Sequence, residues 1–245
     1  VSFLDKTLRT SEIPDGSANG LQVEGAENIT KIGLAVDACL EAYRLAEQKG
    51  CQMVIAHHGL IWDGLRSVKG PAYKQIEFLV KSGINLYASH LPLDLHPTLG
   101  NNAQIARVLG LKNVQPFGAY KNGMHVGFEG YLSKAATVKF ISEIVKKAFG
   151  GPVLSLPFGP PKIWRVAIIS GGGSFALREA IEKKIDLFVT GEPSHENHHA
   201  AQEGNLNVVY GGHYHTEKPG LIALGDFLEK RFGVKTEFLD VPTLV

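Results

Sequence analysis

The chain has 245 residues, which is long enough to bury a substantial core as one large domain or as two lobes. It is 44% hydrophobic and 20% charged, a composition typical of a globular α/β protein and unlike that of a disordered chain. The formal net charge of +1, without long runs of like charge, disfavours strong electrostatic binding to nucleic acid or to an anionic membrane.

The sequence predicts a reducing, cytoplasmic location. Cys39 and Cys51 do not form a Cys-x-x-Cys pair, and we expect them to be small buried side chains, not a disulfide framework. The stretch VSFLDKTLRT lacks the pattern of a signal peptide, and no apolar run is long enough to cross a bilayer. Ten histidines are the one unusual total, so their positions carry the most information.

Short apolar runs alternate with helical patterns in the first half of the chain. Strands are predicted at residues 31–37, 51–56 and 84–89, and amphipathic helices at 39–50, 72–83 and 101–110. Strands that alternate with helices favour α/β sheets with partly parallel order.

The pattern resets at residues 125–133. Beyond this point helices are predicted at 135–150, 174–184 and 220–233, strands at 164–170, 185–190, 207–212 and 234–240, and a Pro/Gly-rich loop or lobe connection at 150–162. We therefore expect a first α/β lobe at residues 1–125 and a second at residues 126–219. Residues 220–245 could pack back on the first lobe.

The two halves share a pattern that favours an internal duplication. Residues 32–58 align with residues 166–192 without a gap, each as strand, turn, helix and strand. The following strand in each half leads into a Tyr-x-x-His-x-x-x-acid pattern, formed by Tyr87, His90 and Asp94 and by Tyr210, His213 and Glu217. Identities elsewhere are few, so chance similarity between two generic βαβ units is the alternative.

Histidines and acids gather where the predicted strands end, which is where parallel α/β sheets bind ligands. They are His57, His58, His90, Asp94, Glu192, His213 and Glu217. Adjacent side chains in extended backbone point to opposite faces, so His57 and His58 suit two neighbouring ions better than one. Hydrolytic sites use two ions about 3.5–4 Å apart. A single histidine at a strand end is more often structural, but seven candidates together favour a metal site.

Five motifs resemble those of the Nif-three-like proteins, whose bacterial members are commonly labelled GTP cyclohydrolase 1 type 2 homologs. The motifs are NGLQVEG (19–25), AHHG (56–59), SHLPLDLHPTLGNN (89–102), TGE (190–192) and GGHYHTEKPG (211–220). The resemblance spans nearly the whole chain and implies a dinuclear metal site in the cleft between two similar α/β lobes. It also implies a toroidal homohexamer. Longer family members insert an extra domain between the lobes, for which this chain is too short.

The same resemblance implies a ligand set for two divalent ions, which imidazole and carboxylate ligands restrict to metals such as Zn, Fe, Mn, Co or Ni. His57 and His58 would each bind one ion. Asp94 would join the ion of His57, His213 would join the ion of His58, and Glu217 would bridge both ions.

Catalytic roles are expected for His90 and Glu192 as proton carriers, and His90 could also be a weak ligand or could orient one. His215 departs from the commoner adjacent-histidine form of the last motif. His195 and His199, four residues apart on a predicted helix, could contact substrate or form a solvated face. The glycines of SGGGSFALREA are interpreted as a tight turn in preference to a phosphate cradle.

Two functions from different classes remain open. The first is a dinuclear-metal-dependent hydrolase with a small-molecule substrate, and the family label suggests that water opens the purine ring of GTP. A phosphoester or another cyclic amide would fit equally well. The second is a non-enzymatic metal-binding or regulatory scaffold, a ring of subunits whose ligands leave no open coordination position. Nucleic-acid binding is disfavoured by the near-neutral charge.

Overall fold

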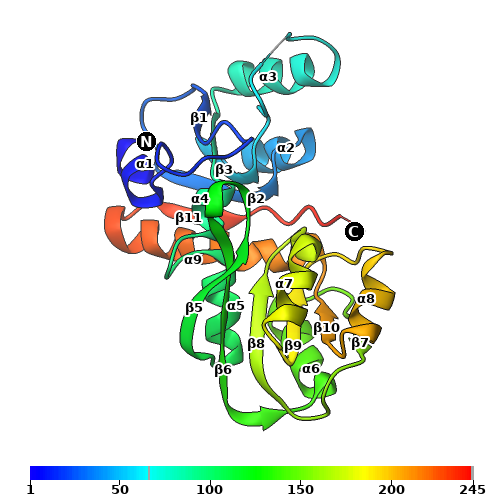
Figure 1. Cartoon of the computed structure of the whole chain (residues 1–245). Coiled ribbons are helices and arrows are strands. Elements are labelled where there is room, and N and C mark those ends of the chain that lie inside the picture. Colours follow the sequence, from blue (N-terminus) through cyan, green and yellow to red (C-terminus); the bar gives the residue numbers. More distant parts are fainter. Residues whose placement is uncertain (66, 244–245) are drawn as a thin grey trace. The chain divides into compact units, whose positions relative to one another are not determined.

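The computed structural model describes residues 1–65 and 67–243, and the chain divides into two compact units (Figure 1). Unit 1 contains Val1–Leu99 and Gly220–Pro242, and unit 2 contains Gly100–Pro219 together with Thr243. The division falls after Leu99, whereas the sequence suggested a boundary at residue 125. The reason is that the strand at Lys112–Ala119 pairs within the second sheet. Among the described helices, none is both long and apolar enough to span a membrane.

Unit 1 is built on a five-stranded sheet of order β1-β4-β3-β2-β11. Its strands are β1 (Gly20–Val23), β2 (Lys31–Asp37), β3 (Met53–His58), β4 (Asn85–Ala88) and β11 (Lys235–Phe238). Its helices are α1 (Ser2–Leu8), α2 (Leu40–Gln48), α3 (Gly70–Ser82) and α4 (Leu91–Asp94). Of the five described strands, β1 alone runs antiparallel to its neighbour. The chain after residue 220 returns to this unit because β11 pairs with β2; residues 244–245 lie outside the described part.

The core of unit 1 explains why its strands are apolar along nearly their whole length. All but the last residue of β3 are buried, as expected for a parallel strand that is covered on both faces. On α2, Ala42, Tyr43 and Ala46 are fully buried and pack with Val54 and Leu86 of the sheet. This packing fixes the carboxyl ends of β2, β3 and β4 at one edge of the sheet.

Unit 2 is built on a six-stranded sheet of order β5-β6-β8-β9-β10-β7. Its strands are β5 (Lys112–Ala119), β6 (His125–Ala136), β7 (Leu154–Pro157), β8 (Ile163–Ile169), β9 (Leu187–Thr190) and β10 (Asn207–Tyr210). Its helices are α5 (Asn101–Leu109), α6 (Val138–Phe149), α7 (Leu177–Glu182) and α8 (Asn197–Glu203), with 3₁₀ turns η1 (Lys121–Gly123) and η2 (Gly173–Ala176). Helix α9 (His213–Phe232) begins in unit 2 and ends in unit 1.

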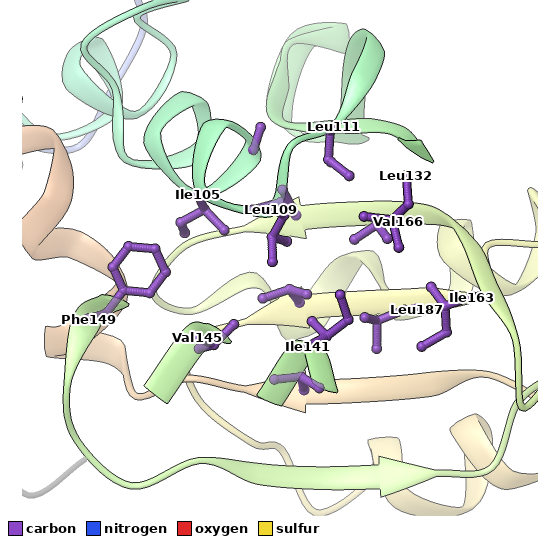
Figure 2. Close-up of a cluster of buried hydrophobic side chains, with 14 residues drawn as sticks. Ile105, Leu109, Leu111, Leu132, Ile141, Val145, Phe149, Ile163, Val166 and Leu187 are labelled. Atoms are coloured by element: carbon purple, nitrogen blue, oxygen red, sulfur yellow. The ribbon is translucent and has the colours of Figure 1, made fainter. Parts of the chain in front are cut away.

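One face of the second sheet carries a cluster of fourteen buried apolar residues (Figure 2). Helix α5 contributes Ile105 and Leu109, and α6 contributes Ile141 and Val145, to pack on strand residues such as Val166. Burying a large aliphatic side chain stabilises the fold by about 1.5–3 kcal/mol. The cluster therefore fixes the sheet whose β9 and β10 ends carry polar residues.

Two sequence-based assignments were wrong. The Pro/Gly-rich segment 150–162 was expected to be a loop, but it contains β7, which pairs antiparallel with β10 at the sheet edge. Proline is tolerated on an edge strand. The last helix was expected to begin at residue 220, but α9 begins at His213, after Gly212 with a φ of 84°. Pro219 and Gly220 hid the helical pattern of this segment in the sequence, because proline and glycine both disfavour helix interiors.

The two sheets share one pattern of strand pairing. Ile32 lies opposite Met53 between β2 and β3, and Val166 lies opposite Leu187 between β8 and β9. These four residues are the ones that the alignment of 32–58 with 166–192 superimposes. Both parallel pairs are extended by a third parallel strand and then by an antiparallel one.

The alignment of the third strands needs a correction by one residue. Ile55 lies opposite Tyr87 in unit 1, and Val189 lies opposite Val209 in unit 2. Tyr87 therefore corresponds to Val209, not to Tyr210. Successive strand residues point to opposite faces, so the two tyrosines do not occupy equivalent positions.

Candidate metal centre

Three histidines converge at the carboxyl ends of β3 and β4 in unit 1. One ring nitrogen from each of His57, His58 and His90 lies within 4.8 Å of the other two. The rings of His57 and His58 are 4.9 Å apart between centroids, and His90 lies 5.2 Å and 5.6 Å from them. Adjacent residues of one strand thus reach the same small volume, although the rings are inclined by 50°.

The histidines of β3 are oriented through Nδ1. His57 is fully buried, and its Nδ1 donates to the carbonyl of Ser89 at 3.0 Å. His58 donates through Nδ1 to the Asp37 carboxylate at 2.8 Å, and the two residues are direct neighbours across the β2–β3 ladder. Carbonyls and carboxylates only accept hydrogen bonds, so Nδ1 carries the proton in both rings. A metal ion would therefore bind the other ring nitrogen, Nε2.

His90 is oriented in the same way by a loop from the beginning of the chain. Its Nδ1 lies 3.0 Å from both carboxylate oxygens of Asp15, whose side chain is only 3% exposed. Asp15 also accepts from Asn19 and from the backbone N–H of Leu91. Burial raises the pKa of Asp15, but His90, Asn19 and Leu91 together lower it to about 2. The carboxylate is thus charged over the physiological pH range.

A carboxylate joins this group from α4. Asp94 is 6% exposed, and its Oδ2 lies 3.5 Å from Nε2 of His57. The short helix begins directly after His90 and places Asp94 one turn later, where its backbone N–H donates to the His90 carbonyl. Unit 1 therefore supplies three imidazoles and one carboxylate of the predicted set.

Unit 2 carries a second polar group at the start of α9. His213 and Glu217 lie one helical turn apart, and Nε2 of His213 is 3.2 Å from Oε2 of Glu217. Nδ1 of His213 lies 2.9 Å from the carboxylate of Glu192, which follows β9. Burial lowers the pKa of His213, but the hydrogen bonds and charges of Glu217 and Glu192 raise it to about 9.

A glycine turn after β8 fixes this second group. The Gly171 carbonyl accepts from the backbone N–H groups of Gly191 and Glu192, and Gly171 N–H donates to Thr216. Its φ is 59°, and a Cβ at this position would overlap the Glu217 carboxylate. The glycines of this segment thus form a tight turn that holds strand ends and α9 together, as the sequence suggested.

The donor set fits a borderline divalent metal ion. In each of the four histidines, Nδ1 faces an acceptor, and in His57 and His213 Nε2 faces a carboxylate. Where a nitrogen lone pair faces a carboxylate, a proton or a cation must lie between the two atoms. At His213 a proton takes this place, because the neighbouring carboxylates raise the pKa of the ring. Mixed imidazole and carboxylate ligands suit Zn, Fe, Mn, Co or Ni.

Comparison with known proteins decides the family. The model of the family described as Duf34/NIF3 (NGG1p interacting factor 3) matches residues 1–243. The chain belongs to the Duf34/NIF3 family. A curated relative from Archaeoglobus fulgidus, named "GTP cyclohydrolase 1 type 2 homolog", is 46% identical over 243 residues, covering 99% of this chain and 97% of the relative.

Two solved structures share the fold over the whole chain. The structure of the protein ybgI, described as of unknown function, matches with a TM-score of 0.92 and 33% identity, covering 100% of this chain and 97% of that chain. TTHA1606 from Thermus thermophilus matches with a TM-score of 0.91 and 39% identity, covering 100% and 98%. The family resemblance inferred from the five motifs is thereby confirmed.

In this Duf34/NIF3 chain, sequence reasoning missed two residues. Asp37 and Asp15 orient His58 and His90 but were not among the candidates. Asp37 could have been found from the sequence, because it ends β2, the strand next to the one that ends in His57 and His58. Asp15 could not, because it lies in a loop 75 residues before its partner.

Several other histidines have different surroundings. Nδ1 of His96 accepts from the backbone N–H groups of Thr98 and Leu99, a structural role. Nδ1 of His215 lies 3.3 Å from the Phe149 carbonyl. Three exposed histidines of unit 2, His195, His198 and His199, lie around α8, and a fourth, His125, is the first residue of β6.

Proposed function

We propose that this protein is a dinuclear-metal-dependent hydrolase. One ion would be held by His57 and Asp94, the other by His58 and His213, and Glu217 would bridge them. The observation that carries the proposal is the shared orientation of the four histidines, each of which turns Nδ1 to an acceptor of its own unit. Ligating histidines in metalloproteins are characteristically oriented this way. The ligands come from both units, and we propose that they hold the same pair of ions.

A pair of divalent ions supplies such a site with an acidified water and with Lewis-acid polarisation of the substrate. The protein's own residues would position and move protons. His90, held by the charged Asp15, would present Nε2 toward the ligands as a proton acceptor or a weak ligand. Glu192 would fix the tautomer of His213 and take up a proton from it. Each is within hydrogen-bond reach of a partner, the geometric condition for proton transfer.

The proposed substrate is a small molecule with a hydrolysable ring or ester, such as GTP, another nucleotide or a cyclic amide. The name shared by the curated relatives supports GTP. That name describes similarity to an enzyme, so GTP belongs in a substrate panel together with phosphoesters and cyclic amides.

We further propose that the two units arose by internal duplication and that six chains form a ring. β2 pairs with β3 in the same register in which β8 pairs with β9, and this supports the duplication. Membership of the Duf34/NIF3 family supports the ring through the resemblance noted in the sequence.

Metal content tests the proposed centre. Elemental analysis of untagged protein purified without oxygen should find about two ions per chain. Glu217→Gln should lower both, because it removes the bridging charge, whereas Asp94→Asn should lose only the ion of His57. Glu143→Gln and Asp226→Asn are matched controls, since both side chains are exposed and should retain both ions.

Turnover tests the reaction. The loaded protein should hydrolyse at least one member of the substrate panel, and Glu217→Gln should abolish this activity. Full metal content in both ligand variants would contradict the ligand set. If the protein binds two ions but hydrolyses no compound of the panel, the proposed hydrolase activity is contradicted. The non-enzymatic metal-binding scaffold would then be the remaining function.

A further inference from the structure

A pocket in unit 2 lies beside the residues that orient His213. Two hollows of about 380 and 400 Å³ adjoin at the carboxyl ends of β9 and β10. They share Leu154, Pro193 and Tyr210 as lining residues, so we describe them together as one pocket. Each is within the size range of small-molecule sites. Crevices beyond the carboxyl ends of parallel strands are the usual ligand sites of α/β sheets.

The two ends of the pocket differ in chemistry. One hollow is bordered by Gly191, Glu192 and Gly212, and the Glu192 carboxylate is the partner of His213 Nδ1. The other hollow is lined by a hydroxyl and three imidazoles, from Ser194, His195, His198 and His199. Among the described residues that line this second hollow, none is acidic.

Between these ends the lining is apolar. Leu154 of β7 is 52% exposed and lies opposite Tyr210 of β10, which is 3% exposed. Pro193 completes the strip. Apolar side chains of this kind favour contact with the apolar face of a ring. A bound ring would cover the exposed Leu154 side chain and remove its apolar surface from water.

Tyr210, which lines both hollows, carries a buried hydroxyl. Among the described residues this hydroxyl has no hydrogen-bond partner. Burial also raises the pKa of Tyr210, so the hydroxyl keeps its proton. A buried polar group without a partner is rare and costly in a native protein, and this one belongs to a residue that lines both hollows.

The geometry points to a small organic phosphate with a flat apolar group as the occupant of this pocket. Its ring would lie on the strip of Leu154, Pro193 and Tyr210. Its anionic group would accept hydrogen bonds from Ser194 and the imidazoles, and the far side of its ring would lie toward Glu192. This inference rests on the proposed function, whose substrate class it narrows to ring-bearing organic phosphates.

An ion at the three histidines is the less suitable alternative. A metal site requires ligand atoms that converge, and no such group containing His195, His198 or His199 occurs among the described residues. Imidazole N–H groups and a serine hydroxyl instead supply several separate donors, which suits the dispersed oxygens of a phosphate.

Phenyl phosphate is the probe that tests this pocket. Its affinity for the full chain, first stripped of metal with a chelator, is measured by isothermal titration and by ligand-observed NMR. We expect binding that is at least about tenfold tighter than that of phenol or of inorganic phosphate, because each lacks one of the two recognised groups. If phenol binds as tightly as phenyl phosphate, the pocket does not recognise the anionic group and the inference is overturned. If inorganic phosphate binds as tightly as phenyl phosphate, the pocket does not recognise the ring, which overturns the inference as well.

Variants locate the binding. Leu154→Asp places a charge on the apolar strip, and the double variant His195→Asn/His199→Asn removes two imidazoles. Each should weaken phenyl phosphate binding by about tenfold. The matched controls are Val114→Asp on β5, an exposed position of the opposite edge strand, and His125→Asn, an exposed histidine of the same unit. Circular dichroism verifies that all variants fold.

Unchanged affinity in both pocket variants would overturn the inference, as would equal weakening by the controls. The outcome is separate from that of the proposed function, because the titration uses metal-free protein. Loss of the metal centre would appear as low metal content with intact phenyl phosphate binding. Failure of the pocket would appear as full metal content without such binding.

Discussion

At the scale of single residues, each of the four candidate histidines is oriented by an acceptor from its own unit. Ser89 provides a carbonyl for His57, whereas Asp37, Asp15 and Glu192 provide carboxylates for the others. A carboxylate fixes the tautomer and also makes the imidazole a stronger metal ligand. His57 is oriented by a neutral group, but it is fully buried, so packing limits its rotation.

Removing one orienting carboxylate should weaken metal binding without removing a ligand. Asp37→Asn should lower the affinity for the ion of His58 by about tenfold to hundredfold, because the ring loses its charged partner. Competition with a chromogenic chelator measures this affinity. Asp226→Asn serves as the control, and equal affinities in the two variants would show that Asp37 has no role in orientation.

At the scale of elements, turns at strand ends place the candidate ligands. His213 and Glu217 share one face of α9 because they are four residues apart on a helix. The turn at Gly171 allows the Glu217 carboxylate to lie close to the end of β8. Helix α7 holds another turn, since Glu179 accepts from the backbone N–H groups of Gly118 and Ala119.

Gly171→Ala should displace the Glu217 carboxylate and reduce metal content to less than half of that of the unchanged protein. The matched control is Gly110→Ala, since Gly110 has a similar φ of 69° but no atom within 4 Å of an added Cβ. Both variants should lose about 1 kcal/mol of stability from backbone strain. Only Gly171→Ala should lose metal. Full metal content in this variant would contradict the expectation that a Cβ at position 171 displaces the Glu217 carboxylate.

The stability that Glu179 contributes should depend on pH. Burial raises its pKa, but Ala119, Lys183 and Gly118 together lower it below the ordinary value. The contribution is therefore present above the unfolded pKa and is lost as the pH falls through the folded one. Glu179→Gln should cost about 1 kcal/mol of unfolding free energy at about pH 7 and little at about pH 3.

Urea unfolding at the two pH values measures this difference. Glu182→Gln, an exposed position on the same helix, should change stability little at either pH. A cost for Glu179→Gln that stays the same at both pH values would mean that the lost interaction does not depend on the charge.

At the scale of the whole molecule, the chain supplies two sheets with the same core order of three parallel strands and an antiparallel neighbour. The proposed ring of six chains predicts the mass of the particle. Light scattering coupled to size exclusion should give about six times the chain mass of 26.5 kDa. A monomer or dimer across the whole concentration range would contradict the ring.

The sequence by itself determined the α/β class, most strands and helices, the family and the histidines and acids of the candidate centre. Apolar runs and helical periodicity reflect burial, which is local enough to be visible along the chain. The motifs identified the family because their order and spacing are specific.

Only the tertiary structure decided how these residues are oriented. Asp15 and His90 are 75 residues apart, and no local pattern connects them. Strand β7 and the early start of α9 were also hidden, because proline and glycine disfavour regular structure locally while sheet pairing and helix continuation override that preference. The pocket around Tyr210 depends on the same pairing, since β7 brings Leu154 opposite it.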